Sequence, residues 1–152
     1  MINRPFTALA VSFAALGLAA AAAAQAPAPL AFPGAQGWAA TTPGGRGGQV
    51  IKVTNLNSEG PGSFREAIET KGPRIIVFEV GGVIDLGRKT IKLNEPYVTI
   101  AGQTAPSPGI TLIKGGIDIA AHDAVVQHIR VRPGEAGVAK KSGWDEDSIS
   151  TQ

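Results

Sequence analysis

Apolar residues in this chain fall into many short runs rather than into long periodic segments. From Ile75 onward, β-branched and aliphatic residues recur in brief stretches that Gly, Pro and Asn interrupt. Runs of this kind, bounded by turn-forming residues, predict β-strands. The predicted strands span residues 49–54, 74–80, 83–86, 90–93, 97–101, 110–114, 117–119 and 125–131. The pattern therefore predicts an all-β domain.

One segment has instead the pattern of an amphipathic helix. Ser63, followed three residues later by Glu66, has the spacing of a capping box, and the apolar residues at 64, 67 and 68 fall on one face. Lys-Gly-Pro at 71–73 ends the segment. Because an uncovered end of a strand stack invites aggregation, we expect this short helix to cap the amino-terminal end of the fold.

Two arrangements of the strands fit their lengths. In a β-sandwich, strands recur every ~8–12 residues and pair through hairpins. In a parallel β-helix, short strands stack coil upon coil, and the intervals of 22 residues from Ile76 to Val98 and 27 from Val98 to Val125 suit such coils. No Asn-Gly or Asp-Gly joins neighbouring strands, and glycines at 81–82, 87, 102 and 115–116 allow corners without reversal. These features favour the parallel β-helix.

Residues 1–24 have the pattern of a secretion signal. Arg4 is their only charged residue, residues 6–24 are almost wholly apolar, and small residues at 22–24 predict cleavage before Gln25. A membrane anchor is the alternative, but the stretch is Ala-rich and near the lower length limit for a span. We expect an extended Ala/Pro linker at 25–31 and a folded domain at 32–152. An exported chain without cysteine favours a secreted or periplasmic bacterial protein.

Charge and motifs exclude several classes of function. Removal of the signal would leave 13 Lys and Arg against 12 Asp and Glu, with no concentrated basic stripe for nucleic acid. The glycine run 44–48 lacks the Gly-Lys-Ser/Thr ending of a phosphate loop. Its density instead predicts close backbone packing or positive φ angles. Without cysteine or a Gly-x-Ser-x-Gly elbow, the chain offers no nucleophilic catalytic set.

Five sequence blocks resemble the amino-terminal portion of bacterial pectate lyases of polysaccharide lyase family 1. They are Phe32-Pro-Gly-Ala-Gln-Gly, Gly44-Gly-Arg-Gly-Gly, Gly60-Pro-Gly-Ser-Phe-Arg-Glu-Ala, Ile100-Ala-Gly-Gln-Thr-Ala-Pro and Ile129-Arg-Val-Arg-Pro-Gly-Glu. The resemblance covers about residues 32–149. It implies a right-handed parallel β-helix with an amino-terminal helical cap, Ca²⁺ dependence and cleavage of polygalacturonate, an acidic polysaccharide, by β-elimination. We expect the protein to be a monomer.

The acidic run Asp145-Glu146-Asp147 is the candidate metal site. If these residues lie in a strand, alternation places Asp145 and Asp147 on one face and Glu146 on the other. Ca²⁺ takes six to eight oxygen ligands, so further ligands are required; a solvated acidic turn is the alternative. The resemblance assigns Asp145 and Asp147 to the first two calcium carboxylates. It implies that the other acidic ligands and an arginine base lie beyond Gln152, so we expect an amino-terminal fragment that is inactive alone.

Three residues near this run are weaker candidates. Trp144 could line a sugar-binding surface or anchor a loop, and Lys140 and Lys141 could pair with uronate carboxylates or form a solvated face.

Histidines and arginines elsewhere carry less functional signal. His122 lies in an Ala-rich turn, His128 is predicted mid-strand, and neither has a catalytic neighbour in sequence. Arg130 and Arg132 share one strand face and are interpreted mainly as scaffold. Three alternative functions stay open: a catalytically silent β-helix for carbohydrate binding or surface attachment, a hydrolase with paired acids, and a metal-independent lyase acting on methylated pectin.

Overall fold

Ten strands, one α-helix and one 3₁₀ turn make up the part of the chain that the computed structural model describes, residues 27–135, 137–139, 141–143 and 145–152. In chain order they are β1 (Gln49–Val53), α1 (Phe64–Glu69), β2 (Arg74–Phe78), β3 (Gly82–Asp85), β4 (Ile91–Leu93), β5 (Val98–Ala101), η1 (Gly102–Thr104), β6 (Ile110–Ile113), β7 (Ile117–Ile119), β8 (Ala124–Gln127), β9 (Ile129–Arg132) and β10 (Ile149–Thr151).

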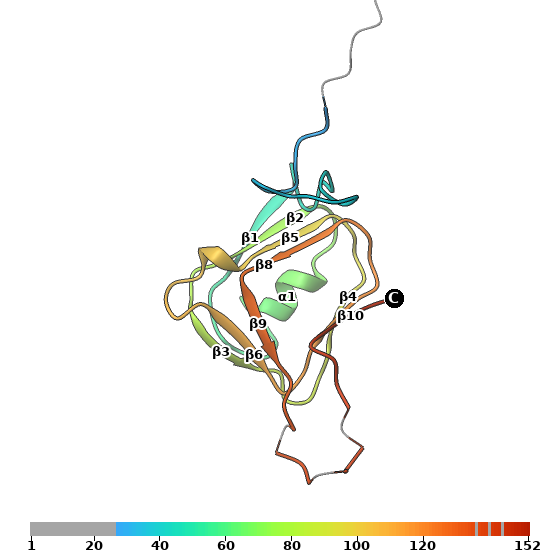
Figure 1. Cartoon of the computed structure of the whole chain (residues 1–152). Helices are drawn as coiled ribbons and strands as arrows, with labels where there is room; N and C mark the ends of the chain where they lie inside the picture. The colour runs from blue at the N-terminus through green and yellow to red at the C-terminus, as the bar shows by residue number, and fades with distance from the viewer. Residues whose placement is uncertain (1–26, 136, 140, 144) are drawn as a thin grey trace, which may run out of the picture.

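These strands wind into a right-handed parallel β-helix (Figure 1). Sheet A has the order β1-β2-β5-β8, sheet B the order β3-β6-β9 and sheet C the order β10-β7-β4. All strand pairs found in the described residues are parallel. The predicted stacking is confirmed and the β-sandwich is excluded. Ile76 pairs with Ile100 rather than with Val98, so the first coil is two residues longer than the interval between the apolar runs.

A narrow aliphatic core fills the coil. Alternating residues point inward, so that Ile76 lies beside Ile100 and Ile84 beside Leu112, each at 0 or 1% exposure. Full burial of such a side chain contributes roughly 1.5–3 kcal/mol. In the last coil, the described neighbours cover Ile129 and Val131 only partly.

Helix α1 closes the amino-terminal end of this core, as the sequence predicts. Ser63 Oγ accepts a hydrogen bond from Glu66 N at 3.2 Å. The Glu66 carboxylate accepts in return from Gly62 N at 2.7 Å, one residue before the usual capping-box donor. Phe64 is fully buried, with its ring centroid 5.3 Å from that of Phe78. Figure 1, viewed along the coil axis, shows α1 inside the outline of the strands.

Arg74 is a buried cation that joins the helix to the first coil. Its guanidinium donates to the carbonyl oxygens of Ile68 at 2.6 Å, Gly72 at 3.0 Å, and Glu95 and Pro96 at 3.2 Å each. Burial lowers the pKa of Arg74 from its ordinary value, while the charge of Glu95 acts in the opposite direction. Among the described residues, Arg74 Nε has no hydrogen-bond partner.

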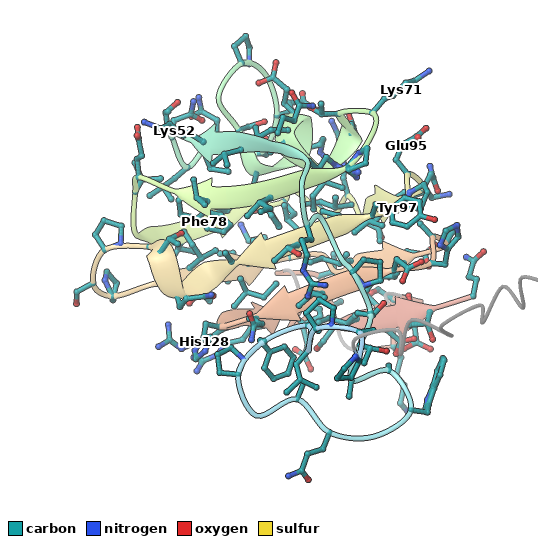
Figure 2. All side chains as sticks on the ribbon, turned by 90° about the horizontal axis from the view of Figure 1, so that it is seen from above. Lys52, Lys71, Phe78, Glu95, Tyr97 and His128 are labelled. Atoms are coloured by element: carbon teal, nitrogen blue, oxygen red, sulfur yellow. The ribbon has the colours of Figure 1, made fainter. Side chains whose placement is uncertain are left out.

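The glycine-rich segment 31–48 packs closely against sheet A, as its composition predicts (Figure 2). Gly45 N donates to Thr99 Oγ1 at 2.9 Å, and a Cβ atom on Gly45 would stand 1.8 Å from the carbonyl oxygen of Arg74. Only glycine permits this approach. Within the predicted linker, the carbonyl oxygen of Leu30 accepts from Arg46 at 2.7 Å.

The predicted signal at 1–24 lies outside the described residues. Within those residues, no helix is long and apolar enough to cross a membrane.

One strand prediction is wrong in its continuity. The run 125–131 is divided into β8 and β9 by His128, whose φ of 54° turns the chain from sheet A into sheet B. His128 is therefore a corner residue and not a mid-strand residue. Corners at Arg88, Tyr97, Lys114 and Asp123 also have positive φ without glycine. The pattern of apolar residues does not reveal where one residue adopts a left-handed backbone conformation, because the residues on both sides of it remain extended.

Candidate metal and substrate site

Asp145 and Asp147 lie on the segment that precedes β10, which begins only at Ile149. Both side chains are exposed, and neither has a salt bridge to another described residue. The expected alternation on one strand is wrong, because no strand includes these two positions. Their assignment as metal ligands stays a prediction.

Contacts with the preceding coils hold this segment in place. Glu146 is half-buried and accepts a hydrogen bond from Thr90 Oγ1, which lies two coils earlier and immediately precedes β4 of sheet C. A Cβ atom on Gly116 would stand 2.1 Å from the carbonyl oxygen of Asp147. Ile117 N donates to Ser148 O at 3.1 Å. The missing side chain at Gly116 therefore lets the acidic segment lie directly on the coil.

The carboxylates of Asp145 and Asp147 are the type of ligand that Ca²⁺ prefers, but they are too few to complete its coordination shell. Exposed carboxylate oxygens are the hard ligands that Ca²⁺ prefers, and the ion takes six to eight of them. Within the described ranges, no group of three or more His, Cys, Asp or Glu residues is placed to hold a metal ion. Asp145 and Asp147 could supply only part of a coordination shell.

Asp118 is a polar residue of sheet C that the sequence analysis does not single out. It lies in the middle of β7, paired in register with Lys92 of β4 and Ser150 of β10. Its carboxylate accepts from Gln152 Nε2 at 2.8 Å and from Ser150 Oγ at 3.5 Å. The sequence did contain a signal for Asp118, because it stands between two isoleucines of a predicted strand. Alternation then places the Asp118 carboxylate on the outer face.

The His122 ring contacts the carboxylate of Asp123, the next residue in the sequence, although nothing in the sequence marks this pair as functional. Its Nδ1 lies 2.7 Å from Asp123 Oδ2, while Thr42 Oγ1 donates to Asp123 Oδ1 at 2.5 Å. These contacts, with the Thr42 hydrogen bond as the largest cause, hold the pKa of Asp123 below its ordinary value. The three side chains fasten the amino-terminal segment to the corner before β8. Trp38, on that segment, is 99% exposed.

The structure places Arg130 and Arg132 on the outside of the coil, and their interpretation as scaffold stays a prediction. Both are exposed on the outer face of β9. Arg130 Nη1 donates to Pro108 O at 2.9 Å, which is its only hydrogen bond to a described side chain or backbone group. The Arg132 side chain has no hydrogen bond or ion pair with any residue that the structure describes. Trp144 and Lys140 lie outside those residues, and Lys141 is exposed.

Comparison with known proteins relates this chain to pectate lyases. It is 49% identical over 115 residues to a protein of Emericella nidulans described as probable pectate lyase C, a match covering 75% of this chain and 27% of that protein. Proteins with the same description from Aspergillus flavus (47% over 113 residues, 74% of this chain and 26% of the relative) and Aspergillus terreus (45% over 122 residues, 80% and 28%) are also similar. No family model matches the chain.

Such identity over three quarters of the chain makes these proteins homologues and supports the resemblance to pectate lyases. The parallel β-helix agrees with it. This chain spans about a quarter of the length of the relatives it matches. Those relatives are fungal, so they give no support to the expected bacterial origin.

Proposed function

We propose that this chain forms the amino-terminal coils of a secreted pectate lyase that cleaves polygalacturonate by Ca²⁺-assisted β-elimination. The observation that carries the proposal is the 49% identity over 115 residues to a probable pectate lyase. The parallel β-helix supports it, because Asp145 and Asp147 are exposed on the segment that precedes β10 of sheet C.

Asp145 and Asp147 would hold Ca²⁺ together with ligands from outside these 152 residues. Bound Ca²⁺ would draw charge from the uronate carboxylate and make the hydrogen on C5 of the sugar more acidic. In the elimination, an arginine base takes that proton, the electron pair of the C5–H bond forms a C4–C5 double bond, and the 4-linked sugar leaves with its oxygen. We place the base outside this chain as well.

Residues around the acidic segment would position its carboxylates. The Glu146 contact with Thr90 engages the middle carboxylate, which leaves the carboxylates on either side for a ligand. Gly116 sets the depth at which the Asp147 backbone rests on the coil. A binding group gains from such support, because fewer conformations are lost when the ligand binds.

Calcium titration of the purified chain tests the metal assignment. We expect weak binding, with Kd on the order of 10⁻³ M or weaker, because two carboxylates leave most of the shell to water. Asp145→Asn and Asp147→Asn should each reduce the calorimetric or Tb³⁺-luminescence signal. Glu135→Gln, which removes an exposed carboxylate from the same β9–β10 connection, should not. Equal binding by all variants would contradict the role of Asp145 and Asp147.

Incubation with polygalacturonate and Ca²⁺, followed by the ultraviolet absorbance of unsaturated product, tests the placement of the base. We expect no product from the 152-residue chain alone. Appreciable turnover would show that the base lies within the chain and would overturn that part of the proposal.

A second candidate function is carbohydrate binding without cleavage. The solenoid architecture favours it, because stacked coils present extended surfaces of the kind that solenoid proteins use for binding. Calcium-dependent retention on a pectate column, with no unsaturated product from a chain extended to the length of the relatives, would support this function over the lyase.

A further inference from the structure

Two arginines lie side by side on the outer face of β9. Ile129 and Val131 turn toward the core, and the exposed Arg130 and Arg132 alternate with them. Two residues along a strand separate their Cα atoms by ~6.6 Å. In the register of sheet B, Arg130 lies beside Thr111 and Arg132 beside Ile113, so the strand next to them contributes no charge at either position.

Among the described residues, no carboxylate forms an ion pair with Arg130 or Arg132. Asp85, on β3 of the same sheet, already accepts a hydrogen bond from Lys114 at 2.5 Å. Glu135 is exposed beyond the end of β9 and forms no ion pair with either arginine. The guanidinium groups of Arg130 and Arg132 are therefore free to bind an anion, apart from the single Arg130 bond to Pro108 O.

A hollow beside Arg130 gives the face a defined shape. Its lining includes Gln103, Gly109, His128 and Arg130, from two successive coils at the corner between sheets A and B. A Cβ atom on Gly109 would stand 3.4 Å from Arg130 Nη1, so the lack of a side chain there keeps the guanidinium uncovered. Figure 2 shows His128 at the end of sheet A opposite Tyr97, whereas Thr42 of segment 31–48 is bound to Asp123 at the corner before β8.

We propose that the outer face of β9 is an anchoring site for an acidic polysaccharide, with Arg130 and Arg132 binding carboxylates of neighbouring uronate residues. The guanidinium group presents paired N–H donors that match a carboxylate. The choice of a polyuronate rests on the proposed function. The anchoring site itself differs from the Asp145–Asp147 segment, requires no metal and lies on sheet B. It would hold the polymer against the coil while the metal-dependent site acts elsewhere on the chain.

Binding of the 152-residue chain to immobilised polygalacturonate in EDTA tests this site, since EDTA silences the proposed calcium site. We expect measurable retention at low salt that falls as salt rises. Arg130→Gln and Arg132→Gln should each weaken binding about tenfold, as expected for loss of one charge-assisted pair. Arg88→Gln is the matched control. Arg88 is exposed on the β3–β4 connection, and its substitution removes the same positive charge at a different place on the surface. Dextran, a neutral polymer, should not retain the wild-type chain.

Each outcome decides for or against the site. Equal weakening by Arg88→Gln and by the two β9 variants would show dependence on overall charge and would overturn the proposal, as would no retention of the wild type at low salt. Calcium titration of Arg130→Gln separates the two hypotheses, because this variant should bind Ca²⁺ as the wild type does while it loses retention in EDTA. Retention that depends on Arg130 and Arg132 would survive a failure of the lyase proposal. Thermal melts of all variants exclude loss of folding as the cause.

Discussion

Gly116→Ala is the most direct test of how the fold supports the acidic segment. The added Cβ atom would stand 2.1 Å from the Asp147 carbonyl oxygen and 3.0 Å from that of Ser148, whereas real Cβ contacts essentially never fall below 3.0 Å. The segment must therefore move outward by at least about 0.9 Å. That movement lengthens the 3.1 Å hydrogen bond from Ile117 N to Ser148 O and pulls Glu146 away from Thr90.

We expect Gly116→Ala to destabilise the chain by about 1–3 kcal/mol, the usual cost of overpacking, partly offset by the smaller entropy of the unfolded chain. For a domain of this size, each kcal/mol corresponds to roughly 3–6 °C in Tm.

Thermal unfolding followed by circular dichroism measures this loss, and amide hydrogen exchange locates it. Exchange should accelerate at Ile117 and across β10, while the amides of β1 and β2, at the other end of the coil, keep their protection. Gly115→Ala is the control for a clash at a different place. Its Cβ atom would stand 2.8 Å from Lys89 O and would press on the first coil instead of on the acidic segment. Unchanged Tm and unchanged exchange in β10 for Gly116→Ala would refute the claim that close approach at this glycine positions Asp145 and Asp147.

Three further changes probe the parts of the fold that support the sites. Ser63→Ala should lower the free energy of unfolding by about 1 kcal/mol in urea titrations, because it removes the helix cap, whereas Ser58→Ala, whose hydroxyl has no hydrogen bond to a described residue, should not. Arg74→Ala should lower it by about 3 kcal/mol or more, because the buried carbonyl group of Ile68 and three partly buried carbonyl groups lose their donor; a loss below 1 kcal/mol would contradict this account. The lowered pKa of Asp123 means that its contribution is fully present above the ordinary value of 3.8 and is lost as pH falls through the folded-state pKa. Proteolysis of segment 31–48 should accordingly increase on acidification, and Asp123→Asn should make it insensitive to pH in that range.

The alternation within short strands, the glycine corners and the capping helix were all readable from the sequence. These features depend on local rules: a strand with one buried face needs period-two patterning, a corner needs turn-forming residues, and Ser63 with Glu66 satisfies the first free N–H groups of a helix. The missing hairpin signals then separated stacked coils from a sandwich. The glycine run 44–48 likewise predicted close packing, although not its partner on sheet A.

Only the tertiary structure decided which of these residues meet. His128 alone divides an apolar run into strands of two sheets, and Thr90 reaches Glu146 across 56 residues of sequence. The burial of Arg74 and the exposure of Arg132 could not be distinguished from composition, because both arginines lie in strands beside β-branched residues. The physical reason is that strand patterning specifies which face each side chain takes, whereas its partners across the coil depend on the register between coils. That register is a long-range property fixed by how many residues each corner contains.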